Sequence, residues 1–288
     1  MELRRTVQRA GSTSTYSRRR SSAGAAEAPI PRKSLGQHWL RDRNIIRRIV
    51  DAAEVAPSDQ VLEVGPGLGD LTQALAERAG RVVAVEIDPR LAAELRRRFA
   101  AEPRVTVVEQ DALHLDPASL FGPGGEYLVV SNLPYNVGTA IVRRLLEARP
   151  RPRRLVVMLQ KEVVAAMLAP AGRMGLLAVA VQVFATGRRL FDVAPGAFTP
   201  PPAVRSSVIR LDIRPEPLVP EPEQGKFFEV LRAGFSAPRK QIRNALAQGL
   251  GVSAAEAEAM LRRAAIDPAR RPETLGIDDW LRLTRAAR

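Results

Sequence analysis

The amino-acid sequence predicts an α/β protein with a doubly wound parallel sheet, followed by a smaller helical domain. Between residues 43 and 159, short runs of β-branched residues alternate with amphipathic helical patterns. This alternation is typical of parallel sheets that carry helices on both faces. A proline-rich segment at 215–225 then precedes four further helical patterns. A length of 288 residues suits one large domain with a small appendage.

The first half of the chain has clear start and stop signals. Apolar residues at helical spacing predict helices at 43–55, 70–79 and 138–148. Asp88 followed by Pro89 predicts an N-cap and the first helical position of another helix. Short apolar runs predict buried strands at 61–64, 81–86, 105–109, 127–130 and 155–159.

The pattern changes in the second half. Segments 178–193 and 206–213 are rich in strand-forming residues and predict an antiparallel addition to the sheet. Helices are expected at 227–235, 239–250, 253–264 and 277–287. The predicted organisation is a disordered basic tail at 1–30, an α/β domain at 31–214, a linker at 215–225 and a helical domain at 226–288.

The composition excludes several classes of site. The chain has no Cys, and His occurs only at positions 38 and 114. Thiolate zinc sites, a cysteine nucleophile and a His-rich metal centre are therefore excluded, and we expect no metal. No apolar run approaches the length of a membrane span, so we expect no membrane association.

The net charge of +13 indicates an anionic partner. Lys occurs only at 33, 161, 226 and 240, so nearly all of the 44 basic residues are arginines, whose planar fork suits phosphate. We expect a nucleic acid, although arginine enrichment is also typical of GC-rich genomes. The Arg- and Ser-rich residues 1–30 are too poor in large apolar side chains to fold, and they also resemble an organellar transit peptide.

Three successive strands end in residues that suit a nucleoside. Gly65, Gly67 and Gly69 follow the first strand, Glu86 ends the second, and Asp111 follows the third. The carboxyl ends of parallel strands meet at one edge of the sheet, where ligands bind. Glycines let a ligand approach the backbone, a carboxylate at the place of Glu86 can accept from ribose hydroxyls, and Asp111 can accept from an adenine amine.

Singly, either carboxylate would equally fit a helix cap or a surface charge. In register with the glycine loop, the two predict a Rossmann-like cofactor domain. The G-x-G-x-G spacing differs from the G-x-G-x-x-G of dinucleotide binders, which disfavours a nicotinamide dehydrogenase. A nucleoside cofactor without pyrophosphate fits better, and S-adenosylmethionine suits the arrangement.

The segment Asn132-Leu133-Pro134-Tyr135 follows the fourth strand. Methyl transfer from a sulfonium requires a nucleophile held in line with the methyl carbon. If that nucleophile is the N6 amine of adenine, the Asn132 oxygen and a main-chain carbonyl of Leu133–Pro134 can accept its hydrogens, and Tyr135 can stack on the base. A plain β-turn also fits Asn-x-Pro, but a turn does not explain its place beside the predicted pocket.

Several blocks occur in one order along the chain: KSLGQHWLRD (33–42), LEVGPGLGDLT (62–72), VVAVEIDPRL (82–91), QDAL (110–113), SNLPYNV (131–137), MLQKEV (158–163), AFTPPPAVRSSVIRL (197–211) and FSAPRKQIRNAL (235–246). With them the chain resembles the ribosomal RNA adenine N6-dimethyltransferases, most of all their bacterial 16S rRNA branch, the kasugamycin-sensitivity type. The resemblance runs from about Lys33 to the C-terminus.

The resemblance implies an S-adenosylmethionine-dependent enzyme that makes N6,N6-dimethyladenosine. It implies cofactor contacts from His38, Leu40, Gly65, Gly67, Glu86, Ile87, Asp111, Ala112 and Asn132. It also implies that residues 132–135 hold the target amine and that Phe198 lines the base pocket. The chain departs from the family in one place, because Gln37-His38-Trp39-Leu40 replaces the usual Gln-Asn-Phe-Leu, and the imidazole of His38 can still donate or accept one hydrogen bond.

The resemblance also implies the substrate, two adjacent adenosines in the 3′-terminal hairpin loop of 16S rRNA within the immature 30S subunit. Arg239, Lys240 and Arg243 are expected on a helix that grips the RNA backbone, with a solvated helix face as the alternative. We expect a cytoplasmic monomer. Two other functions remain open: a large-subunit rRNA methylase of the erythromycin-resistance type, and a non-catalytic RNA-binding assembly or transcription factor on the same fold.

Overall fold

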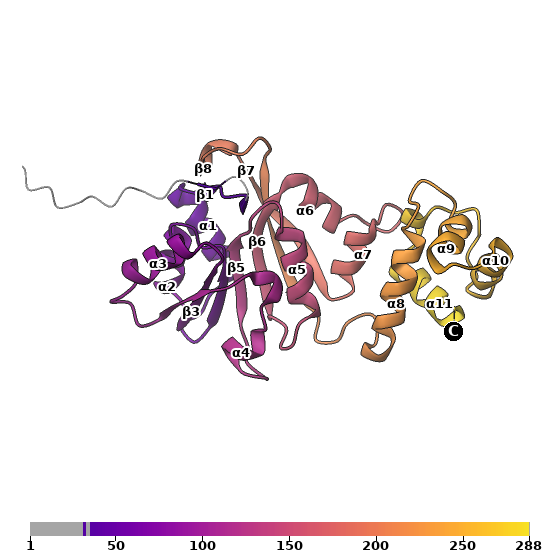
Figure 1. Cartoon of the computed structure of the whole chain (residues 1–288), viewed down its shortest axis with the longest axis horizontal. Helices are drawn as coiled ribbons and strands as arrows, with labels where there is room; N and C mark the ends of the chain where they lie inside the picture. Colours follow the sequence, from indigo (N-terminus) through magenta and orange to yellow (C-terminus); the bar gives the residue numbers. More distant parts are fainter. Residues whose placement is uncertain (1–30, 33–34, 288) are drawn as a thin grey trace, which may run out of the picture. The chain divides into compact units, whose positions relative to one another are not determined.

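The structure is a computed structural model that describes residues 31–32 and 35–287. The predicted disordered tail at 1–30 lies outside the described residues. The described residues belong to one compact unit (Figure 1). The predicted α/β class is confirmed, because strands and helices alternate from residue 60 to residue 160.

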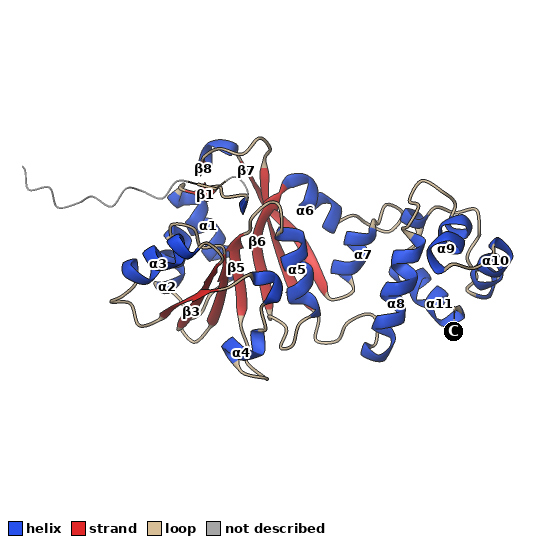
Figure 2. Ribbon diagram, in the orientation of Figure 1, coloured by secondary structure: helices blue, strands red, loops and turns tan. Residues whose placement is uncertain are grey.

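A seven-stranded sheet forms the centre of this unit, in the order β4-β3-β2-β5-β6-β9-β7 (Figure 2). Neighbouring pairs among the first five strands are parallel, whereas β9 pairs antiparallel with both β6 and β7. The antiparallel addition predicted from the sequence is therefore confirmed. The strands are β2 (Gln60–Val64), β3 (Arg81–Glu86), β4 (Val105–Glu109), β5 (Leu128–Asn132), β6 (Arg154–Gln160), β7 (Ala185–Val193) and β9 (Ser206–Ile213).

Helices cover both faces of the sheet. One hydrophobic cluster joins α1 and α2 to one face, and a second cluster joins α5 and α7 to the other. Asp42 caps α1 by accepting from the backbone N–H groups of Asn44 and Ile45, and Asp88 caps α3 as predicted. The helices of this part are α1 (Arg43–Ala53), α2 (Asp70–Ala76), α3 (Pro89–Arg98), α4 (Pro117–Phe121), α5 (Gly138–Glu147), α6 (Lys161–Met167) and α7 (Leu176–Gln182).

The prediction of a strand throughout 178–193 is wrong for its first part. Residues 178–182 belong to α7, which begins after Gly175, and only Ala185–Val193 forms a strand. A short, continuously apolar run has no period that separates a buried helix from a buried strand, so its type depends on tertiary packing.

The order of the strands places a topological switch point between β2 and β5. β3 and β4 extend the sheet on one side of β2, and β5 and β6 extend it on the other. Ligands bind in the crevice at such a point, beyond the carboxyl ends of the strands. A two-stranded ribbon, β1 (Trp39–Leu40) with β8 (Phe198–Thr199), also forms, with Leu40 opposite Phe198.

Four helices follow the sheet, as predicted: α8 (Glu221–Gly234), α9 (Ile242–Leu250), α10 (Ala254–Arg263) and α11 (Ile277–Ala286). The predicted linker at 215–225 is too long, because α8 already begins at Glu221. Pro222 lies in the first turn, where a missing N–H is tolerated. The core of these helices is continuous with that of the sheet, since Phe184 and Phe228 stack with centroids 6.0 Å apart.

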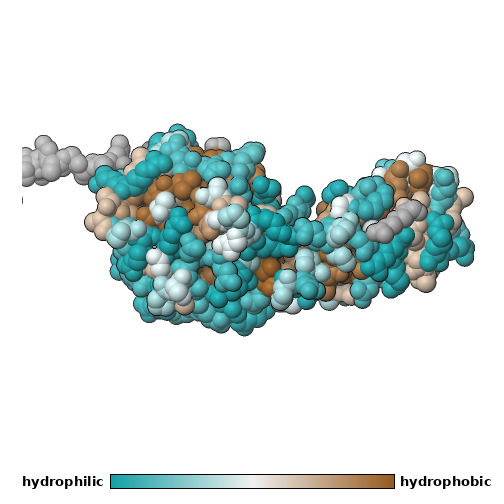
Figure 3. Space-filling model, turned by 90° about the horizontal axis from the view of Figure 1, so that it is seen from below, coloured by the Kyte–Doolittle hydropathy of each residue, from teal (hydrophilic) through white to brown (hydrophobic). Residues whose placement is uncertain are grey.

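Within the described residues, no helix is long and apolar enough to cross a membrane. The face shown in Figure 3 is mainly hydrophilic, with separate hydrophobic areas. The large apolar side chains lie mostly inside, and Ile87 and Leu218 are the large hydrophobic residues exposed in the described part.

Two glycines of α8 test the packing of the helical segment. A Cβ at Gly234 would lie 2.4 Å from the ring of Trp280, which is fully buried, whereas a Cβ at Gly225 would meet nothing within 4 Å. We expect Gly234→Ala to lower the free energy of unfolding by roughly 1–3 kcal/mol through overpacking. Gly225→Ala, the matched control, should raise it by up to about 1 kcal/mol through helix propensity. Urea unfolding measures both, and equal effects would contradict this packing.

Candidate active site

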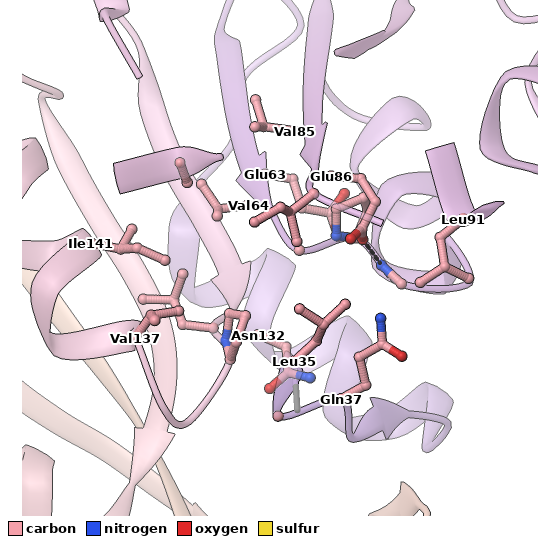
Figure 4. A pocket seen from close by; sticks show the side chains of 18 of the residues that line it. Leu35, Gln37, Glu63, Val64, Val85, Glu86, Leu91, Asn132, Val137 and Ile141 are labelled. Atoms are coloured by element: carbon pink, nitrogen blue, oxygen red, sulfur yellow. Dashed lines mark hydrogen bonds between the residues drawn. The ribbon is translucent and has the colours of Figure 1, made fainter. Parts of the chain in front are cut away.

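A cavity lies at the carboxyl ends of β2, β3, β4 and β5, with an empty volume of about 1090 Å³ including its open mouth. Figure 4 shows Glu63 and Glu86 on neighbouring strands, with Asn132 across the cavity from them. The structure places all the residues predicted to contact the cofactor in the lining of this cavity, and also Leu133, Pro134 and Tyr135. The predicted cofactor contacts are His38, Leu40, Gly65, Gly67, Glu86, Ile87, Asp111, Ala112 and Asn132.

The charge of the cavity is one-sided. Four acidic side chains line it, those of Glu63, Asp70, Glu86 and Asp111, and none of the described lining residues is Lys or Arg. Such a cavity favours a cationic ligand over an anionic one. In the described part of the chain, no group of three or more His, Asp and Glu side chains could hold a metal ion.

Glu86 connects the second strand to the glycine loop. Its carboxylate accepts from the backbone N–H of Gly67 at 3.3 Å and from that of Asp88 at 2.9 Å. The side chain is buried, and this burial raises its pKa. Gly67 has a φ of +58°, and a Cβ there would lie 2.7 Å from the indole of Trp39. Glycine is therefore required both by the backbone conformation and by the close approach of Trp39.

Asp111 is both a helix cap and a cavity-lining carboxylate, the two roles that the sequence allowed for it. Its carboxylate accepts from the backbone N–H of Leu113 at 2.9 Å and so caps the short turn Ala112–His114. The same side chain lines the cavity and is 38% exposed. The cap fixes the carboxylate at the rim and leaves it accessible to a ligand.

Asn132 ends β5 and has one oriented amide. Its Nδ2 donates to the carbonyl oxygen of His38 at 3.0 Å. The opposite amide orientation would place two acceptors against each other, so this bond defines which atom faces the cavity. Asn132 Oδ1 is buried and has no hydrogen-bond partner among the described residues. An unsatisfied buried acceptor costs about 1–3 kcal/mol, and a donor from a ligand would recover that energy.

The rest of the predicted loop is held in place by its neighbours. Tyr135 shares a hydrogen bond with Ser206 at the start of β9, and burial raises the pKa of its hydroxyl. The rings of Tyr135 and His38 lie 5.3 Å apart. Pro134 packs on Gly65, where a Cβ would lie 3.4 Å from the proline ring. The glycine loop and the loop after β5 therefore form one packed unit.

His38 and Phe198 lie on opposite sides of the cavity wall. His38 lines the cavity, and its Nδ1 is 2.8 Å from the carbonyl oxygen of Pro200. The structure does not bring Phe198 to this cavity. It is 3% exposed, lies opposite Leu40 in the ribbon and packs into the core between the sheet and α1. Phe198 therefore supports the segment that holds His38 and Leu40.

Sequence reasoning missed Glu63. This residue lies inside β2, is 1% exposed and lines the cavity, and its Oε2 has no hydrogen-bond partner in the described residues. Burial raises its pKa to about 8, and the carboxylates of Glu86 and Asp70 act in the same direction. The available signal was a charged residue within an apolar run directly before a glycine loop.

The buried carboxyl of Glu63 should make folding depend on pH. Its pKa is about 8 in the folded state, against an ordinary value of 4.5. The unfolded chain therefore releases this proton first, and stability falls as the pH rises from 4.5 towards 8. Over this range, the free energy of unfolding of Glu63→Gln should fall less steeply than that of the wild type, by up to about 1.4 kcal/mol per pH unit.

Urea unfolding at several pH values measures this effect, with the exposed Glu77→Gln as the control. The slope of stability against pH should become flatter only in Glu63→Gln. An unchanged slope in that variant would show that Glu63 is not held protonated by its surroundings.

Comparisons with known proteins agree with this geometry. The sequence profile of the family described as "Ribosomal RNA adenine dimethylase" matches residues 31–287. The chain is 44% identical over 249 residues to "Ribosomal RNA small subunit methyltransferase A" of Dehalococcoides mccartyi, covering 86% of each chain. It is also 44% identical over 266 residues to the protein of the same name from Moorella thermoacetica, covering 89% of this chain and 92% of the relative.

Solved structures give the same result. The 23S rRNA methyltransferase ErmE matches with a TM-score of 0.66 and 32% identity, over 86% of this chain and 98% of that one. A dimethyladenosine transferase from Plasmodium falciparum matches with a TM-score of 0.72 and 25% identity, over 85% and 96%. The Rossmann-like methyltransferase fold predicted from the sequence is thus confirmed, and the chain belongs to the ribosomal RNA adenine dimethylase family.

Proposed function

We propose that this protein transfers methyl groups from S-adenosylmethionine to N6 of two adjacent adenosines in the 3′-terminal hairpin loop of 16S rRNA. The products are N6,N6-dimethyladenosines in the small ribosomal subunit. The observation that carries this proposal is the unpartnered Oδ1 of Asn132, a buried acceptor at the wall of a cavity without lysine or arginine.

The residues of the cavity fit S-adenosylmethionine, which when bound supplies an electrophilic methyl group on a cationic sulfonium. Glu86 faces the cavity from the end of β3 and suits the ribose hydroxyls, with the Gly65 and Gly67 backbone beside it. Asp111 at the rim, flanked by Ala112, suits the adenine amine. The carboxylates of Asp70, Glu86 and Asp111 in the lining favour a ligand that carries positive charge.

Two acceptors can hold the target amine. Asn132 Oδ1 is the first. Of the two main-chain carbonyls named from the sequence, Pro134 O already accepts from the backbone N–H of Gly138 at 2.8 Å, at the start of α5. No backbone N–H of the described residues donates to the carbonyl oxygen of Leu133, so we assign the second acceptor to Leu133. Two acceptors on the N6 hydrogens increase the electron density on nitrogen as the new bond forms.

The transfer needs no strong base in the site, because the N6 proton becomes acidic once nitrogen carries the new methyl group. Tyr135 offers its ring to the target base, and its hydroxyl is fixed by Ser206. Phe198 lies behind the cavity wall and pairs with Leu40 in the ribbon, so it supports the segment that carries Leu40.

The helical segment contributes RNA contacts in this proposal. Arg239 and Lys240 are exposed, but they lie in the turn before α9, which begins at Ile242, so the expectation that they are helical is wrong. The backbone N–H of Ile242 bonds to the carbonyl of Arg270, which fixes the entry to the helix. Arg243 is on α9 and pairs with Glu258 at 2.9 Å. Arg239 and Lys240 are thus better placed than Arg243 to bind phosphate.

The small-subunit substrate is favoured over the alternatives. The small-subunit relatives are 44% identical to this chain, against 32% for the 23S rRNA methyltransferase ErmE. The intact cavity and the free acceptor of Asn132 favour an enzyme over a non-catalytic factor. In this proposal the protein acts as a cytoplasmic monomer on the immature 30S subunit.

The direct test is methyl transfer from labelled S-adenosylmethionine to undermethylated 30S subunits, with 50S subunits as the control. Mapping by primer extension and nucleoside analysis should find N6,N6-dimethyladenosine at two adjacent positions of 16S rRNA and no label in 23S rRNA. Label in 23S rRNA would support the erythromycin-resistance type instead, and no label in either would support the non-catalytic alternative.

A further inference from the structure

Most arginine side chains in the described residues are engaged by a neighbour. Arg210 bonds to Glu54 and Asp212, and Arg104 to Glu102, and many others follow the same pattern. One set differs. In residues 35–287, no acidic group or hydrogen-bond acceptor engages four exposed arginines near the antiparallel edge of the sheet. These four form what we call the α1–β7 surface: Arg43, Arg47 and Arg48 of α1, and Arg188 of β7.

The four side chains belong to one side of the sheet. Arg188 lies opposite Arg210 in the antiparallel pairing of β7 with β9, so the two share a face. Arg210 reaches Glu54, at the C-terminal end of α1, which identifies that face as the α1 side. Farther along β7, the guanidinium of Arg48 sits 3.7 Å from the ring centroid of Phe191. This contact joins helix and strand into one surface.

The acidic side chains around α1 already interact with other groups. Asp42 caps the helix, and Asp51 pairs with Arg78 at 3.0 Å. Glu54 pairs with Arg154 at 2.8 Å and with Arg210 at 2.6 Å. Arg43 and Arg47 stand one turn apart, about 6 Å along the helix axis, where like charges destabilise a helix. The surface therefore keeps a local positive charge that is available to an anionic partner.

The surface adjoins the active site through the chain itself. Trp39 and Leu40 line the cavity, and α1 begins at Arg43, three residues later. An RNA whose base enters the cavity therefore has its backbone within reach of the first turns of α1. Arginine forks bind phosphate in pairs of hydrogen bonds, and such contacts position an RNA without reading its sequence.

We infer that the α1–β7 surface binds the phosphate backbone of the substrate RNA beside the cavity, in addition to the basic turn before α9. The inference rests on the proposed function, because it takes RNA as the substrate. It assigns the surface the task of positioning, and no contact with the reacting atoms.

The test compares two triple variants of the full chain with the same change in charge. Arg43→Gln, Arg47→Gln and Arg188→Gln remove unpaired charges from the surface. The control replaces Arg96, Arg97 and Arg104, which are exposed but paired with Glu109, Glu94 and Glu102, at the opposite edge of the sheet. Binding to undermethylated 30S subunits is measured over a range of salt concentrations, and cofactor affinity by calorimetry.

The surface variant should bind 30S subunits at least tenfold more weakly at 0.1 M salt. The slope of log affinity against log salt should fall in magnitude by about 2–3, close to one per lost phosphate contact. Cofactor affinity should stay within twofold of wild type, and thermal stability should not fall. The control variant should change 30S binding less than threefold.

Equal losses in both variants would show an effect of net charge alone and overturn the inference. Unchanged 30S binding in the surface variant would overturn it as well. If that variant instead lost binding to phosphatidylglycerol vesicles while 30S binding persisted, the surface would belong to a membrane. Because the assay measures binding relative to wild type, an inactive wild-type enzyme would count against the proposed function and not against this surface.

Discussion

The hydrogen bond from Asn132 Nδ2 to the carbonyl of His38 is the contact on which the site depends. It joins the end of β5 to a segment 94 residues earlier in the sequence, and it orients the amide. The oxygen that remains is buried and unpaired. A polar atom is seldom left in this state in a folded protein, and the cost is recovered when a ligand supplies a donor. The same bond thus holds two parts of the cavity wall together and leaves Asn132 Oδ1 as an unpaired acceptor.

The rest of the site supports this arrangement through close packing. Gly67 leaves no room for a Cβ, because Trp39 lies against it, and Gly65 has a φ of +68° and packs on Pro134. In the departure from the usual Gln-Asn-Phe-Leu segment, Trp39 takes up this packing role, and His38 turns its ring towards Pro200 and Tyr135. The replaced pair is therefore accommodated by contacts within the wall of the cavity.

Charge is separated between the cavity and the surface. The described cavity lining carries carboxylates and neither lysine nor arginine, which suits a cationic methyl donor. Unpaired arginines lie outside it, on α1, on β7 and before α9. An enzyme that binds a cation and a polyanion together needs such a division, since each ligand would otherwise be repelled by the groups that attract the other. The overall charge of +13 conceals this division.

Much of the fold follows from local patterns in the sequence. The parallel strands and the cap at Asp88 were predictable because periodicity and capping act over a few residues. The helix α7 was not, since its apolar run has no distinguishing period. The two-residue ribbon of β1 and β8 was also hidden, because it depends on pairing between Leu40 and Phe198, far apart in sequence. The position of Phe198 behind the cavity follows from this ribbon.

The candidate site likewise contains residues that could be predicted from the sequence and residues that could not. Residues at strand ends, such as Glu86, Asp111 and Asn132, were predictable because the ends of parallel strands share one edge of the sheet. Glu63 was hidden inside an apparently apolar strand. The free arginines of α1 were hidden because pairing is a tertiary property: Glu54 is taken by Arg154 and Arg210, which are 100 and 156 residues away.

The most direct test of this account is Asn132→Ala, examined for methyl transfer to undermethylated 30S subunits and for S-adenosylmethionine affinity in the same preparation. Loss of a preorganised acceptor should lower the transfer rate by about 10²–10³-fold. Cofactor affinity should fall by less than tenfold, because Glu86, Asp111 and the glycine loop remain. Full dimethylation of the 30S subunit by this variant would contradict the role assigned to Asn132.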